Sequence, residues 1–318
     1  MAIDPSLAGT APAPLLLLAL ALTVEALTAR LGPGPWWLSP VRAAVRAMTW
    51  IEPRLNRPQR SAPTRIVRGL AATAIVGALF AAAALCADRL AAIFPYGWVA
   101  VLAVMIALLD GGAALDEAAR VARALRAGDL LAARGTAEGT LGPAARRMDR
   151  LELTTALTRR LGWRLCVGTI APAVWFAALG LPGLALYRAL AAVALAWSSL
   201  DSPRKAFAFL PLRLHEFAAL APAVVTGLLI VAACLFAPGG RAIKAAAAWA
   251  RGTAGAAFSQ GWVEAVAAAA FAPASPARLP SVTASVNVLR AVVYLGALAL
   301  AFAIALVALA GFNDVPLP

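Results

Sequence analysis

Residues that bind metal ions or form disulfides are scarce in this chain of 318 residues. It has three cysteines and a single histidine, His215. Cys86, Cys166 and Cys234 each lie in or beside an apolar run, no CxxC pair occurs, and free cysteine in such surroundings behaves as a small hydrophobic residue. The sequence therefore argues against a disulfide framework and against a His/Cys metal centre.

Charged residues are also scarce, at 14% against about a quarter in soluble domains. Hydrophobic residues make up 62%, more apolar surface than a water-soluble fold could cover. The 28 Lys and Arg outnumber the 15 Asp and Glu, giving a net charge of +13. These basic residues fall between apolar runs, as the positive-inside rule predicts. We therefore expect an all-α, polytopic protein of a bacterial-type inner membrane, surrounded by membrane lipids, with no nucleic acid as partner.

Apolar stretches of helical length set the expected number of membrane spans. A bilayer core of about 30 Å needs about 20 helical residues, and six stretches come near this length. A seventh, residues 189–200, is too short to cross alone. It follows Leu181-Pro182-Gly183, so residues 166–200 form either a bent hairpin or a broken helix. The six expected spans are residues 14–30, 70–87, 98–115, 166–186, 217–237 and 286–312.

We expect one integral membrane domain over residues 1–318. Residues 32–68 carry seven arginines against one acid, which places them in the cytoplasm. Residues 238–285 are an amphipathic or re-entrant segment, and their orientation stays open.

Residues 116–165 form a basic cytoplasmic insertion with amphipathic helices. Asp116 and Glu117 are expected in the first turn of one helix and Gly128 at its C-terminal cap. Pro143 suits the opening turn of a second helix. An apolar stripe in this second helix lies on the membrane surface or packs against a neighbouring helix; it consists of Leu153, Leu157 and Leu161.

Isolated polar residues give only weak functional signals. Glu25 lies inside the first apolar run, where a carboxylate is a functional candidate, although it is near the end of that run. Asp110 is interpreted as an interfacial cap. Glu264 suits a structural hydrogen bond as well as catalysis, and His215 is interpreted as a solvated interfacial residue. No P-loop, GxGxxG, HExxH or GxSxG motif stands in a supporting context.

Six short motifs occur in an ordered series whose spacing is more specific than any one of them. Together they resemble the CobD/CbiB family, the membrane-bound adenosylcobinamide-phosphate synthases of cobalamin biosynthesis. The resemblance covers roughly residues 15–312. The motifs are Trp37-Leu38-Ser39-Pro40-Val41-Arg42, Arg126-Ala127-Gly128-Asp129-Leu130, Gly168-Thr169-Ile170-Ala171-Pro172, Ala185-Leu186-Tyr187-Arg188-Ala189, Leu210-Pro211-Leu212-Arg213-Leu214 and Trp262-Val263-Glu264-Ala265.

The resemblance implies ATP- and Mg²⁺-dependent ligation of an amino-alcohol phosphate to a corrinoid carboxylate. The family carries acidic and amide residues beside its landmarks, whereas this chain has apolar or basic ones. A Mg²⁺ site needs carboxylate oxygens, and replacing acids by bases repels the ion. The degenerate positions are Trp163, Arg164, Val167, Ala191, Ala194, Arg204 and Lys205.

The leading interpretation is a family member that has lost the ligase site and serves as a structural or binding subunit of a membrane complex. On this interpretation no catalytic residue, metal or cofactor is expected, membrane-protein partners are expected, and an anion could bind Arg164, Arg204, Lys205 and Arg213. The alternative is an active adenosylcobinamide-phosphate synthase with ATP and Mg²⁺. A third is a small transporter or lipid-binding module that uses Glu25.

Overall fold

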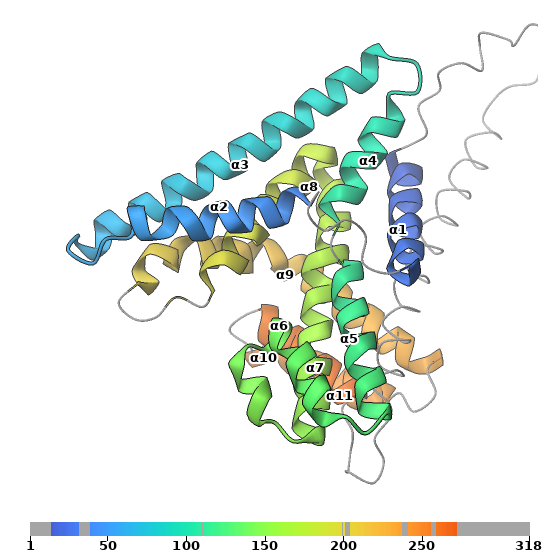
Figure 1. Cartoon of the computed structure of the whole chain (residues 1–318). Helices are drawn as coiled ribbons and strands as arrows, with labels where there is room; N and C mark the ends of the chain where they lie inside the picture. Colours follow the sequence, from blue (N-terminus) through green and yellow to red (C-terminus); the bar gives the residue numbers. More distant parts are fainter. Residues whose placement is uncertain are drawn as a thin grey trace, which may run out of the picture.

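The computed structural model describes residues 14–31, 39–109, 111–198, 200, 204–236, 241–255 and 259–271. Within these ranges the secondary structure is entirely helical (Figure 1), which confirms the expected fold class. The elements in chain order are α1 (Pro14–Leu31), α2 (Pro40–Leu55), α3 (Ala62–Ile93), α4 (Trp98–Leu108), α5 (Gly111–Arg126), α6 (Leu130–Leu141), the 3₁₀ helix η2 (Pro143–Arg147), α7 (Arg150–Leu165), the π-helix η3 (Cys166–Ile170), α8 (Ala171–Trp197), α9 (Lys205–Phe236), α10 (Ala242–Gly255) and α11 (Ser259–Phe271).

In the described part of the chain, three helical stretches are long and apolar enough to cross a membrane: Ala62–Ile93, Arg150–Trp197 and Lys205–Leu235. The first contains the span predicted at residues 70–87, and the third holds most of the span predicted at residues 217–237, of which residue 237 lies outside the described residues. The predicted span at residues 14–30 corresponds to α1, whose apolar part is shorter. The predicted span at residues 286–312 lies outside the described residues.

The span predicted at residues 98–115 is wrong, because α4 ends at Leu108. Leu109 has extended backbone angles, and its N–H still bonds to the carbonyl of Met105. A new helix, α5, begins at Gly111, so the helix that we expected to start at Asp116 starts earlier. Gly128 follows α5 with φ of 78°, the left-handed conformation that glycine adopts at helix ends.

The segment expected to form the second helix of the insertion is divided into two elements. Pro143 opens only the short η2, and α6 precedes it. The next long helix, α7, begins after Asp149, whose carboxylate accepts a hydrogen bond from the Glu152 N–H while Glu152 bonds back to the Asp149 N–H. This reciprocal pair is a capping box, and it fixes the start of the helix that carries much of the site described below.

The chain reverses direction at Gly180, inside α8. Gly180 has φ of 69° and ψ of −160°, outside the helical region. The Arg188 side chain donates a hydrogen bond to the carbonyl of Val167 at 3.0 Å, although 21 residues of straight helix would separate them by about 30 Å. The predicted span at residues 166–186 is therefore not one straight helix, and the bent hairpin is the alternative that holds.

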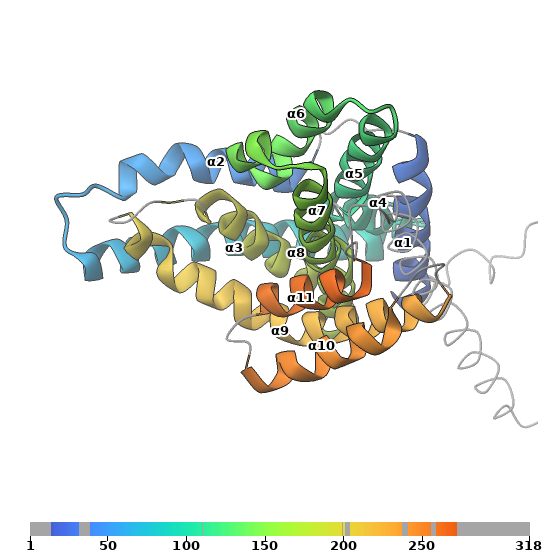
Figure 2. The ribbon, with the colours of Figure 1, turned by 90° about the horizontal axis from the view of Figure 1, so that it is seen from below.

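Two large apolar cores and a small third one stabilise the described part of the bundle. One surrounds α7, where the stripe of Leu153, Leu157 and Leu161 is fully buried against α5, α6 and α11; packing on neighbouring helices is thus the alternative that holds. In Figure 2, α10 and α11 lie side by side, and both helices pack against α9. The other core joins α2, α3, α8 and α9, with Trp197 and Phe207 in edge-to-face contact at 4.6 Å.

Candidate functional site

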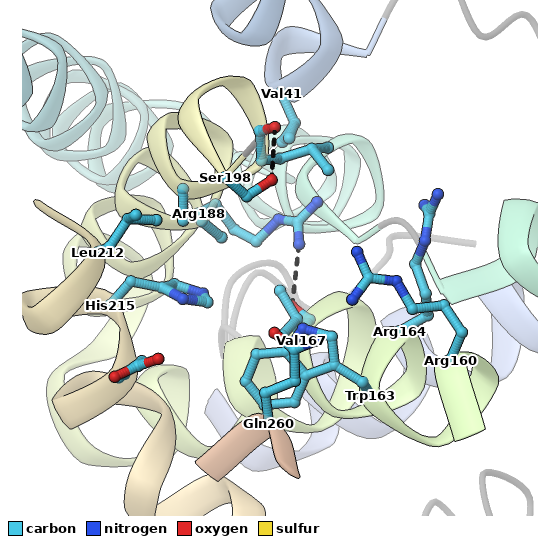
Figure 3. Close-up of a pocket in the computed structure, with 15 residues that line it drawn as sticks. Val41, Arg160, Trp163, Arg164, Val167, Arg188, Ser198, Leu212, His215 and Gln260 are labelled. Atoms are coloured by element: carbon cyan, nitrogen blue, oxygen red, sulfur yellow. Dashed lines mark hydrogen bonds between the residues drawn. The ribbon is translucent and has the colours of Figure 1, made fainter. Parts of the chain in front are cut away.

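A cavity of about 280 Å³ lies where α7, η3, the second half of α8 and α9 converge. Because the chain reverses at Gly180, the residues before and after the bend face one another across this space (Figure 3). One residue each from α2 and α11 complete the lining. The lining residues are Val41, Arg160, Trp163, Arg164, Val167, Gly168, Arg188, Ala191, Ala194, Leu195, Ser198, Leu212, His215, Glu216 and Gln260.

Five of the seven positions singled out in the sequence line this cavity. They come from both arms of the reversed segment, so residues about 25 positions apart in the chain become neighbours. Arg204, Lys205 and Arg213, which we grouped with Arg164 as anion ligands, do not line it. The five lining positions are Trp163, Arg164, Val167, Ala191 and Ala194.

Arginine supplies most of the charge around the cavity. Arg160, Arg164 and Arg188 line it, against Glu216 as the only lining carboxylate among the described residues. Arg188 is 2% exposed and is positioned by its bond to the Val167 carbonyl. Since three guanidinium groups outnumber the carboxylates of the described lining, this lining favours a ligand of negative charge.

Two carboxylates lie at the edge of this basic group, and each is already paired. Glu216 lies 3.5 Å from the Arg213 guanidinium, one helical turn away. Glu264 lies 3.6 Å from Arg160 and accepts a 2.8 Å hydrogen bond from the Gln260 amide. Glu264 therefore makes the structural hydrogen bond that the sequence suggested, and it fixes α11 against α7 at the cavity.

Two sequence-based interpretations of α9 are wrong. We expected no carboxylate at the degenerate site, but Glu216 lines it, since α9 presents residues 212, 215 and 216 on one face. We expected His215 to be solvated, but it is 6% exposed. Its ring stacks on Tyr187, with centroids 5.8 Å apart, and meets Trp163 edge-on at 5.9 Å. Spacing alone could not reveal this, because Trp163 and Tyr187 belong to other helices.

Arg204 belongs to a separate polar cluster that joins α2 to the start of α9. Its guanidinium lies 3.6 Å from the Glu52 carboxylate, which is 4% exposed. The Asn56 amide donates hydrogen bonds both to Glu52, at 2.5 Å, and to the Arg204 carbonyl, at 3.2 Å. We read this cluster as a structural junction. Lys205 is exposed beside it.

Glu25 lies outside the cavity lining. It is 8% exposed, and both of its carboxylate oxygens lie 3.4 Å from the Thr169 hydroxyl. Thr169 belongs to the π-helix η3, and such insertions are frequent at functional sites. The contact ties α1 to the segment that leads into the cavity. Asp110 lies outside the described residues.

The donor set around the cavity does not fit a Mg²⁺–nucleotide. Mg²⁺ is bound through carboxylate and phosphate oxygens, and Glu216, the one carboxylate in the described lining, already faces Arg213. Across the described ranges, no group of three or more His, Cys, Asp or Glu side chains gathers. Three guanidinium groups at the cavity repel a divalent cation.

Comparison with known proteins gives one consistent result. Residues 18–273 match the family described as CobD/Cbib protein. The chain is 30% identical over 239 residues to a cobalamin biosynthesis protein CobD of Sinorhizobium sp, covering 73% of this chain and 72% of the relative. It is 33% identical over 132 residues to the protein of the same name in Rhizobium meliloti (strain 1021), 41% of this chain and 40% of that one. No solved structure matches significantly.

Proposed function

The chain belongs to the CobD/CbiB family, and from that premise we propose that it is a member without ligase activity. It binds an anionic ligand in the cavity without a metal ion, and it serves cobalamin biosynthesis as a binding subunit of a complex in the inner membrane. The relatives' names support the pathway, and the three long apolar helices support the membrane location.

One observation carries the proposal: five of the seven degenerate positions line a single cavity whose charge is mainly basic. Ala191 and Ala194 offer neither ligands nor hydrogen bonds, while Arg164 and Arg188 offer guanidinium donors. Guanidinium groups bind phosphate and carboxylate oxygens in pairs. A cavity of about 280 Å³ is at the small end of ligand sites, so it suits a compact anion better than a nucleotide.

The direct test measures binding of inorganic phosphate and of Mg²⁺–ATP to the full chain in lipid nanodiscs by isothermal titration calorimetry. We expect phosphate to bind without Mg²⁺, and added Mg²⁺ to leave its affinity unchanged. Arg164→Ala should weaken binding about tenfold or more, the value of a lost hydrogen bond to a charged group. Binding of Mg²⁺–ATP with no binding of phosphate would refute the proposal.

A matched control comes from the neighbouring helix face. Arg159 lies on α7 next to Arg160, is exposed, and does not line the cavity. Arg159→Ala removes the same charge from the same helix, so it should leave phosphate affinity unchanged. If both arginine variants weaken binding equally, the effect is the general positive charge of the surface and the cavity is not the site.

The second candidate function is the family's adenosylcobinamide-phosphate synthase activity. The family match over residues 18–273 favours it, and Glu216 places one carboxylate at the cavity. This candidate requires that the gene restore corrinoid-dependent growth to a strain that lacks the synthase. It also requires ATP-dependent product formation by the pure protein. Growth with the wild-type gene but not with Glu216→Gln would establish it.

The subunit role has its own test. Purification of the full chain from its native membranes in mild detergent should yield a stoichiometric membrane-protein partner at a constant ratio through two chromatographic steps. A lone protomer would refute the subunit role and leave the anion-binding role standing, since the latter depends only on residues of this chain.

A further inference from the structure

His215 is an almost fully buried polar ring in the lining of the cavity. Tyr187 stacks on it, with an interplanar angle of 28°, and Trp163 meets it at 86°. The two contacts come from α8 and α7, so three helices fix the orientation of the imidazole. In Figure 3 the ring points toward the space between Arg188 and Trp163. The arrangement positions a rigid hydrogen-bonding group at the cavity wall.

The Nε2 atom of His215 is buried and has no hydrogen-bond partner in the described part of the chain. The Tyr187 hydroxyl beside it is likewise buried and unsatisfied. Burying such an atom without a partner destabilises the folded state. A histidine kept for stability would be hydrogen-bonded, and a phenylalanine would fill the same aromatic clamp without this penalty. The imidazole therefore gains its partner from outside the chain.

The surroundings indicate what that partner is. His215, Arg164 and Arg188 line the same cavity, so a ligand atom near Nε2 lies in a field of positive charge. A neutral imidazole with its proton on Nε2 donates a hydrogen bond. Guanidinium groups are donors only, so the ligand atom that accepts this bond and lies among them is the oxygen of an anion. A phosphate or carboxylate head that displaces the side chains covering Nε2 accepts from the ring and from guanidinium together.

We propose that His215 is the residue that recognises the ligand, by donating an Nε2–H hydrogen bond to the oxyanion head of a compact organic anion. The inference rests on the proposed anion-binding function and adds to it a specificity-determining residue and a ligand class. The arginines attract any anion. The imidazole has a fixed orientation, so it selects an anion that can place an oxygen in line with the Nε2–H bond.

Two variants of the full chain in nanodiscs test this role. His215→Phe keeps the aromatic packing and removes the nitrogen, and His215→Gln keeps a hydrogen-bonding group. In the ligand-free state, His215→Phe should melt at the same temperature as wild type or higher, because it removes an unsatisfied buried atom. Its affinity for inorganic phosphate, measured by calorimetry, should fall at least tenfold. His215→Gln should stay within about threefold of wild type.

The outcomes separate this inference from the proposed function. If wild type binds phosphate, Arg164→Ala weakens binding and His215→Phe does not, the role of His215 is refuted and the anion site stands. A ligand-free melting temperature that falls in His215→Phe, with affinity unchanged, shows a structural histidine and also refutes it. If wild type binds neither phosphate nor acetate, both proposals fail. Binding of phosphate alone assigns the head group as phosphate, and binding of both assigns a general oxyanion.

Discussion

The contact between α3 and α9 gives a sharp prediction, because Gly69 brings the two backbones together. A Cβ atom at Gly69 would lie 1.9 Å from the carbonyl oxygen of Phe207 and 3.0 Å from its carbonyl carbon. Carbon–oxygen contacts in proteins are about 3.3 Å or longer. Both atoms that would be struck belong to the backbone, so no side-chain rotation relieves the clash. Gly69→Ala therefore requires the helices to separate by about 1.4 Å.

The expected magnitude follows from two opposing effects. Overpacking of a close contact costs about 1–3 kcal/mol, and a clash with backbone falls at the upper end of that range. The higher helix propensity of alanine relative to glycine stabilises the helix by about 1 kcal/mol. The net loss of stability should be about 2 kcal/mol. Separation of the helices also disturbs Phe207, which contacts Trp197 at the end of α8.

The same substitution at Gly135 is the matched control. Gly135 lies in α6, and a Cβ there meets nothing within 4 Å. Gly135→Ala should thus stabilise the chain by about 0.5–1 kcal/mol. Apparent melting temperatures of both variants in one detergent should move in opposite directions. A Gly69→Ala protein that melts at or above the wild-type temperature would show that α3 and α9 do not pack as closely as described.

Three further substitutions test other parts of the fold through the same melting measurement. Asp149→Ala removes the cap of α7 and should cost about 1 kcal/mol, whereas Asp149→Asn should cost much less. Trp197→Phe deletes the 3.2 Å hydrogen bond from the Trp197 indole to the Met48 carbonyl and should destabilise the folded chain by about 1–2 kcal/mol. An unchanged melting temperature would show that this bond does not contribute to stability. Glu138 raises the pKa of Arg146 through an exposed hydrogen bond and ion pair, and Glu138→Gln should leave the melting temperature unchanged because such pairs contribute little.

The sequence predicted the long helices well, because an uninterrupted apolar run of this length rarely forms anything but a helix. The run at residues 70–87 lies within the longer helix α3, and residues 217–236 of the other run lie within α9. Boundaries inside apolar sequence were harder to predict. The break after Leu108 has only Gly111-Gly112 as a nearby signal, and a glycine pair is equally compatible with a turn or with close packing. Leu181-Pro182-Gly183 did indicate a bend, which the structure places at Gly180.

The cavity was predictable only in part. The family resemblance pointed to positions such as Trp163 and Ala194, which lie far apart in sequence and line one space. His215 and Glu216 were missed, because their environment is created by other helices. A buried histidine and a solvated one look the same in sequence when the surrounding residues are apolar on one side and charged on the other. Arg188, inside an apolar run, was the available signal, since a cation there requires an internal partner.

The reversal at Gly180 separates the framework of the cavity from the side chains that line it. The two opposing walls are one uninterrupted piece of chain, and their separation is determined by the backbone angles of a single glycine and by the Arg188–Val167 bond. Residues such as Ala191 and Ala194 line the cavity and do not determine how far apart its walls lie. Substitutions at those two positions should therefore alter what the cavity binds and leave the fold around it unchanged.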